Sequence, residues 1–228
     1  MPTHLVFTLT ATLAAMGDLA GHERRGSLVW PGRSAILGLL GAALGIRRDG
    51  DFAALDALTV SVAVLSGGTV LRDYHTVQTI PSAAVKRPNS RPEALRDAGL
   101  RANTTITLRD YRQGVACGVV VSGDNLAALA EALHRPRFTL YFGRKACPLS
   151  SPPDPHLIEA ETPQAALAAL TLPPWLPRPA VVQWITDADG IDDAHVEDRH
   201  DRAIDRTSWH FAPRRVAIRQ IDLPAGAA

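Results

Sequence analysis

Residues 31–45 read PGRSAILGLLGAALG, and this stretch decides the fold class. Apolar side chains recur at helical spacing from Ile36 to Leu44, and Gly45 is suited to end a helix, so we predict an amphipathic helix here. The segments on either side alternate as strands do: residues 3–12 read THLVFTLTAT and residues 58–65 read LTVSVAVL. Strand, helix and strand together make one βαβ unit.

A second unit follows later in the chain. We predict a strand over residues 114–122, a helix over 126–133 and a strand over 138–142. Two such units favour an α+β fold with a ferredoxin-like core (split βαβ, RRM-like) over residues 1–150. Residues 151–228 are expected to form a small β-containing C-terminal extension packed on the core, with strands at 181–185 and 216–221.

The connection between the two units, residues 73–112, is polar, basic and interrupted by prolines. It is longer than an ordinary connection, so we expect either a disordered segment or a functional excursion such as a protruding hairpin. The β-prone run at residues 103–108 is a candidate for the returning arm of a hairpin.

Composition places the chain among ordinary globular proteins. It has 228 residues, 46% hydrophobic and 21% charged, which excludes a disordered chain. No apolar run reaches the roughly 18 residues of a membrane helix, and no secretion signal is evident. Cys117 and Cys147 form no Cys-x-x-Cys pair. We therefore expect a cytoplasmic protein with two free thiols and no membrane partner.

Charge is segregated although the formal net charge is only +1. Residues 82–112 hold seven basic and three acidic residues, and residues 135–145 hold four basic and none acidic, whereas residues 183–205 hold eight acidic and two basic. Of the 24 Lys and Arg residues, 22 are arginine, whose planar fork suits phosphate. A near-neutral chain can thus present a strongly basic face.

Two short motifs suit phosphate. Residues 140–145 read LYFGRK, so a flexible turn at Gly143 adjoins Arg144 and Lys145. Residues 30–34 read WPGRS at the predicted helix start, where free N–H groups and Arg33 can form an anion site. Each motif is equally compatible with a plain turn or cap whose charges are solvated.

Other chemistry is weakly signalled. His75 is a candidate general base and Tyr74 a candidate acid or base-stacking residue, but no local residue orients His75. The acidic stretch 187–201 superficially suggests a metal, yet it does not match a calcium loop, and a solvated acidic loop is the favoured interpretation. No nucleophile elbow and no phosphate-binding glycine loop is present, so residue chemistry does not indicate an enzyme.

Several stretches occur in a familiar order: residues 13–17 (LAAMG), 31–45, 73–77 (DYHTV), 135–149 (RPRFTLYFGRKACPL) and 209–216 (WHFAPRRV). Together they resemble the CasD family of type I-E CRISPR Cascade subunits, within the RAMP superfamily. The resemblance implies a thumb hairpin inserted at about residues 76–109. It also implies a non-catalytic subunit that binds and caps the 5′ handle of the crRNA beside the backbone subunit CasC, the large subunit CasA and other Cascade subunits, without a cofactor or metal.

Charge placement and the resemblance together give a set of candidate RNA-binding residues: Arg24, Arg25, Arg33, Ser34, Tyr74, His75, Lys86, Arg87, Arg91, Arg109, Gly143, Arg144 and Lys145. An alternative is a metal-independent endoribonuclease that processes precursor crRNA with His75, Tyr74 and Lys145. A further alternative is a metal-dependent hydrolase that uses the stretch 187–201.

Overall fold

The computed structural model describes residues 1–21, 23–189, 191, 194–208 and 210–223. These residues form an α+β fold dominated by a largely antiparallel sheet with few helices. Four strands occur in the order β6-β1-β5-β4, with α1 on the connection from β1 to β4 and α4 on the connection from β5 to β6. Their bounds are Thr3–Ala14 (β1), Arg33–Leu44 (α1), Thr59–Thr79 (β4), Asn103–Ser122 (β5), Leu126–His134 (α4) and His156–Glu159 (β6).

The remaining elements extend or cover this sheet. They are β2 (Gly17–Ala20), β3 (Arg24–Ser27), α2 (Ala53–Asp56), α3 (Arg91–Ala98), the 3₁₀ turns η1 (Gly99–Arg101) and η2 (Leu167–Ala169), α5 (Pro163–Ala166), β7 (Val181–Asp187), β8 (His195–Asp205) and β9 (His210–Asp222).

Both faces of the central strands are buried. Phe7 and Val119 belong to the apolar cluster that includes the side chains of α1 and α4. Their neighbours Val6 and Val120 point to the opposite face, where they belong to a second cluster with Trp184. Burial on both faces explains why these strands are so rich in apolar residues.

The helix that decides the fold is confirmed as α1. It ends at Gly45, whose φ of 80° lies in the left-handed region and whose N–H donates to the carbonyl of Ala42. At the other end, Gly32 is extended and supplies no side chain to cap the helix. Asp201 of β8 does so instead, because its carboxylate accepts from the backbone N–H of Arg33 at 2.7 Å. A residue 168 positions away therefore completes this helix.

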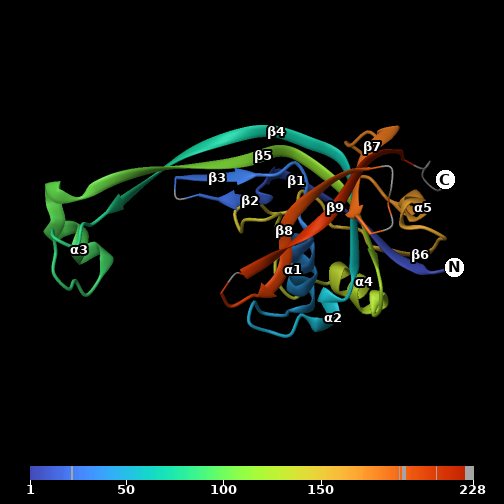
Figure 1. Cartoon of the computed structure of the whole chain (residues 1–228), viewed down its shortest axis with the longest axis horizontal. Helices are drawn as coiled ribbons and strands as arrows, with labels where there is room; N and C mark the ends of the chain where they lie inside the picture. Colours follow the sequence, from blue (N-terminus) through green and yellow to red (C-terminus); the bar gives the residue numbers. More distant parts are fainter. Residues whose placement is uncertain (22, 190, 192–193, 209, 224–228) are drawn as a thin grey trace.

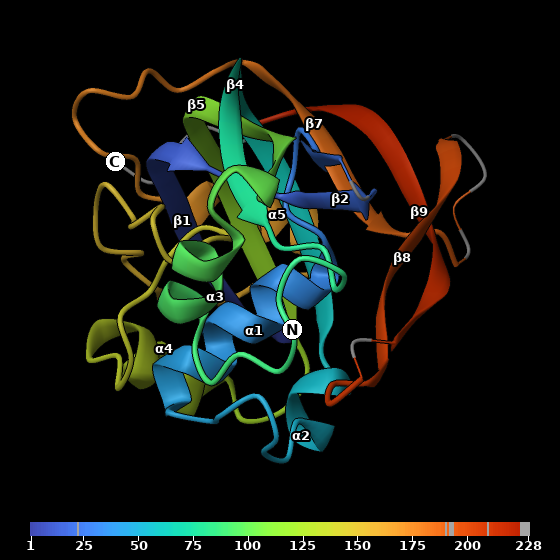
Figure 2. The same ribbon diagram turned by 90° about the vertical axis from the view of Figure 1, so that its left-hand side faces the viewer.

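The excursion between the two βαβ units is an arm of paired strands. β4 and β5 pair from Thr59 with Ser122 to Thr79 with Asn103, with a register shift between Val64 and Ser66, and they extend well beyond the predicted ends of the two strands. Their outer halves leave the core as a two-stranded ribbon that carries α3 at its tip (Figure 1). Figure 2 views the molecule from the tip of this ribbon. We call residues 69–113 the arm.

The C-terminal strands continue the same sheet. β7 pairs with β4 and β9 pairs with β7, so the strands predicted near 181–185 and 216–221 are confirmed. β8 pairs with β9 and was not predicted, because its sequence, HVEDRHDRAID, is polar on both faces. The acidic stretch expected as a loop therefore runs into an edge strand.

The strand predicted over residues 138–142 is wrong. This segment is irregular and has a single bridge, between Tyr141 and Pro148. The place beside β1 is taken by β6, which pairs with it from Thr3 with Glu159 onward. The alternation that suggested a strand instead anchors a loop, since Leu140 and Phe142 are buried in the apolar cluster under α1 and α4.

Both cysteines are free, as expected, and the structure buries them. Burial raises the pKa of Cys117 to about 12, so this thiol stays protonated at neutral pH. Among the described residues, no helix has the length and apolar character needed to span a bilayer.

Candidate nucleic-acid interface

A rigid loop at Gly143 presents two basic residues. Phe142 donates its N–H to the carbonyl of Cys147 at 2.7 Å, and Cys147 donates to the carbonyl of Arg144 at 2.8 Å, which closes a tight turn around buried anchors. Gly143 has a φ of 91°, and a Cβ there would overlap the carbonyl oxygen of Ala15. Glycine is therefore required, and the turn fixes the backbone that carries Arg144 and Lys145.

Arg144 stacks on the arm. Its guanidinium lies over the ring of Tyr111, 4.5 Å from the centroid. Within the described part of the chain, the buried atoms Nη1 of Arg144 and Nε of Arg109 have no hydrogen-bond partner. The Arg144 guanidinium is thus held against an aromatic ring, and a cation paired with a ring is an arrangement that suits a phosphate or a base.

Strand register places further residues on the same side. Arg109 and Tyr111 are two residues apart in β5 and share one face, and Arg25 of β3 lies in register with Arg109. Asp73 of β4 is opposite Arg109, so the register adds an acidic residue to this side. We call Arg25, Arg109, Tyr111 and Arg144 the Arg144 cluster.

The opposite face at the base of the arm carries the arm triad, which comprises Arg24, Arg72 and Asp110. Arg72 donates Nε to Asp110 at 2.7 Å, and Arg24 donates Nη2 at 3.0 Å. The Asp110 side chain is only 7% exposed, whereas those of Arg24 and Arg72 are 61% and 38% exposed. The hydrogen bond from Arg72, assisted by the one from Arg24, lowers the pKa of Asp110 to about 2.

The arm places the other predicted residues further from the core. Tyr74 is 71% exposed, and Lys86 and Arg87 are exposed at the tip. Arg91 donates Nη2 to the carbonyl of Gln78 at 2.6 Å. His75 is half-buried and lines, with Arg91, a hollow of about 470 Å³. The structure therefore distributes these residues along the arm rather than in one pocket.

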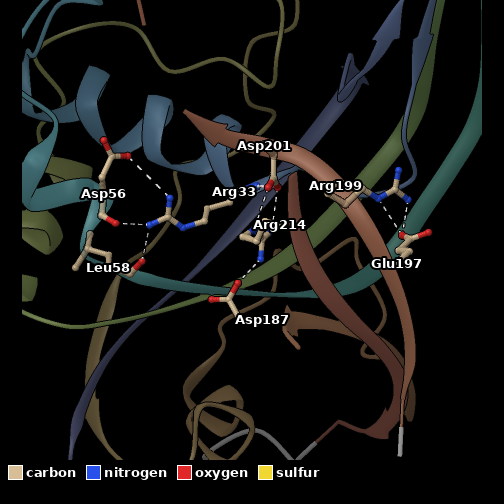
Figure 3. A network of polar contacts seen from close by, with 8 residues as sticks. All are labelled: Arg33, Asp56, Leu58, Asp187, Glu197, Arg199, Asp201 and Arg214. Carbon is tan, nitrogen blue, oxygen red and sulfur yellow. Dashed lines mark hydrogen bonds and ion pairs between the residues drawn. The ribbon is translucent and has the colours of Figure 1, made fainter. Parts of the chain in front are cut away.

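The predicted phosphate site at the start of α1 is occupied by the protein itself (Figure 3). Asp201 takes the N–H of Arg33, and the buried Arg33 guanidinium donates Nη2 to the carbonyls of Asp56 and Leu58 at 2.6 and 3.0 Å. Burial is the largest influence on Arg33 and lowers its pKa. Arg33 thus makes these contacts within the protein, and the RNA-binding roles of Arg33 and Ser34 stay predictions.

The acidic stretch contributes to the same interior contacts. Asp201 accepts from Nε and Nη2 of Arg214 at 2.9 and 2.8 Å, and Asp187 accepts from Nη1 at 2.5 Å. Among the described residues no group of three candidate ligands is placed to hold a metal ion, while residues 190, 192 and 193 lie outside that description. We call Arg33, Asp56, Asp187, Asp201 and Arg214 the buried network.

The residues of the nuclease alternative are not brought together. Tyr74 and His75 are adjacent in β4 and so point to opposite faces of the arm. His75 lies four residues beyond Leu71, the partner of Tyr111, which is about 13 Å along the strand. Lys145 belongs to the loop whose Arg144 contacts Tyr111. The geometry thus does not bring His75, Tyr74 and Lys145 into one site.

Sequence reasoning missed Arg72 and Asp110. The available signal was Asp110 itself, an acidic residue within the basic run LRDYR at residues 108–112. Alternation along a strand sets Asp110 on the face opposite Arg109 and Tyr111. The pairing of β3 with β5, which brings Arg24 to Asp110, follows no local pattern.

Comparison with known proteins identifies the family. Residues 4–217 match the model described as CRISPR-associated protein (Cas_Cas5), and the chain belongs to this family. The CRISPR system Cascade subunit CasD of Escherichia coli (strain K12) is 34% identical over 185 residues, covering 73% of this chain and 76% of CasD. The family expected from the motifs is confirmed.

Solved structures agree with the fold. A chain described as CRISPR RNA-guided surveillance complex aligns with a TM-score of 0.70 at 23% identity, covering 97% of this chain and 91% of that one. A second, described as Crystal structure of Cas protein, aligns with a TM-score of 0.66 at 25% identity, covering 99% and 98%.

Proposed function

We propose that this chain is a non-catalytic subunit of a type I-E CRISPR Cascade complex that binds and caps the 5′ handle of the crRNA. The observation that carries the proposal is the Arg144 cluster, in which Arg144 lies over Tyr111 and strand register sets Arg25 and Arg109 on the same face at the base of the arm. Guanidinium groups neutralise phosphates without reading sequence, and an aromatic ring packs an unstacked base. The similarity to CasD supports the same role.

The proposal extends to the architecture. We assign β1, α1, β4, β5 and α4 to a ferredoxin-like RAMP core over residues 1–150, and β6, at the start of the following segment, supplies the fourth strand in the order β6-β1-β5-β4. The arm then corresponds to the thumb expected at residues 76–109, and residues 151–228 to the C-terminal extension. In the assembled complex we expect CasC-like and CasA-like subunits as neighbours and a cytoplasmic location.

Paired substitutions in the Gly143 loop test the RNA-binding role. Arg144→Ala with Lys145→Ala removes two charges that the turn carries beside the base of the arm, so handle RNA should bind roughly 30-fold more weakly. Fluorescence anisotropy with a labelled handle RNA measures the change. The matched control is Arg47→Ala with Arg135→Ala, which removes two exposed arginines elsewhere on the chain. Wild-type affinity in the loop variant contradicts the assignment.

The non-catalytic part has its own test. Purified protein is incubated with repeat RNA in EDTA, and the products are separated on a denaturing gel. We expect intact RNA. Specific cleavage that disappears in His75→Ala contradicts the proposal and favours the metal-independent endoribonuclease.

A further inference from the structure

The arm triad has the form of a preorganised anion clamp. Arg24 and Arg72 both donate their Nε and Nη2 edges to Asp110, from strands on either side of it. In the described part of the chain, Nη1 of neither arginine has a partner. A carboxylate that stays ionised thus holds two guanidinium groups side by side, with a net charge of +1 and their free edges toward solvent.

The triad continues into an exposed aromatic surface. Tyr74 is two residues beyond Arg72 in β4 and therefore lies on the same face, about 7 Å further along the arm. Its ring is 71% exposed, and Ile106, on the same face of β5, is 54% exposed. Cationic groups followed by an exposed ring are the features with which proteins hold single-stranded nucleic acid.

We propose that Asp110 positions Arg24 and Arg72 to clamp one phosphodiester of the guide RNA, and that Tyr74 receives the base beside it. This inference rests on the proposed function and adds a second contact region, on the face of the arm opposite the Arg144 cluster. The RNA handle then contacts both faces at the base of the arm. Asp110 is a positioning residue, and the two arginines and Tyr74 touch the RNA.

The direction in which RNA affinity changes when Asp110 loses its charge separates this positioning role from a purely structural one. Removing a carboxylate near a phosphate chain ordinarily strengthens RNA binding, because repulsion is lost. If Asp110 positions the arginines, Asp110→Asn instead weakens binding, by about fivefold, because the two guanidinium groups lose their fixed orientation. Asp73→Asn is the matched control, since it removes an exposed carboxylate from the other face of the same arm and should leave affinity equal or higher.

The experiment measures anisotropy of the full chain with a labelled handle RNA and with an oligo-uridine of equal length. Arg24→Gln with Arg72→Gln should weaken binding of both RNAs about tenfold, because phosphate contacts carry no sequence information. Tyr74→Ala should also lose about tenfold, while Tyr74→Phe retains binding, since stacking needs only the ring. Circular dichroism and thermal unfolding verify that every variant is folded.

The outcomes distinguish the two proposals. Weaker binding by Asp110→Asn with unchanged or tighter binding by Asp73→Asn supports the clamp. If the wild-type chain binds RNA and Asp110→Asn binds it equally well or more tightly, the clamp is overturned. The triad is then only a structural contact, and the proposed function stands. A wild-type chain that binds neither RNA overturns both.

Discussion

Two arginine–carboxylate networks use the same chemistry for different ends. In the arm triad, Asp110 is buried and its arginines reach solvent. In the buried network, Arg214 and Asp201 are only 12% and 9% exposed, and Arg33 is equally enclosed. A guanidinium that is buried and bonded to carbonyls or carboxylates of the protein is poorly accessible to an external phosphate. The comparison shows that charge alone does not identify a candidate binding residue, because arginines of equal charge differ in their exposure and in the partners they already have.

The largest effect is expected in the buried network. Asp201→Ala removes the cap of α1 and leaves the buried Arg214 guanidinium without two of its hydrogen bonds, so the free energy of unfolding should fall by about 3–5 kcal/mol. Urea denaturation measures the change, with the exposed neighbour Asp198→Ala as control. A loss below about 1 kcal/mol contradicts the structural role of this network.

A conservative substitution at Arg33 tests whether this residue stabilises the fold without binding RNA. Arg33→Lys cannot bridge the carbonyls of Asp56 and Leu58 with one planar fork, so unfolding should become easier by about 1–2 kcal/mol. The folded variant should bind handle RNA with wild-type affinity, as measured by anisotropy. Weakened RNA binding by a fully folded variant returns Arg33 to the RNA-binding set.

In the arm triad we expect substitution to lower RNA affinity and to leave the stability of the fold nearly unchanged. Arg72→Ala removes a partly exposed ion pair, and such pairs contribute less than about 1 kcal/mol to stability. Differential scanning calorimetry should therefore show a small shift in Tm, while RNA affinity falls. If Arg72→Ala loses as much stability as Asp201→Ala and keeps its RNA affinity, the predicted difference between the two networks is wrong.

The smallest effect is the pH dependence of Asp110. Its pKa is lowered to about 2 in the folded chain, so the ionised group stabilises the fold above its ordinary pKa near 4, and this contribution is lost as pH falls toward 2. The stability difference between wild type and Asp110→Asn should be constant above about pH 5 and shrink at lower pH. Urea unfolding of both proteins at pH 6, 4 and 3 measures it, and a constant difference contradicts the predicted pairing.

The core could be predicted because its signals are local. The helix of residues 33–44 and its glycine stop follow from apolar spacing, and the inner halves of β4 and β5 follow from alternating β-branched residues. The arm was left open as a hairpin or a disordered segment, because its strands are polar and gain their order from pairing with each other. β8 was missed for the same reason.

The candidate site could be predicted only in part. Charge and sequence context predicted Arg144 and Arg24 as RNA-binding residues, and both lie at the base of the arm. They predicted Arg33 equally, because nothing in the local sequence shows that Asp201 closes the start of α1. Asp110 and Arg72 were missed because their meeting depends on the register between β4 and β5.

The most direct test of the central claim is a structure of the assembled complex with its guide RNA bound to this chain. We expect phosphates of the 5′ handle within about 4 Å of the Arg144 guanidinium and of Arg24 or Arg72, with the RNA backbone uncut. A handle that leaves the base of the arm bare and runs instead along β8 and β9 contradicts this claim.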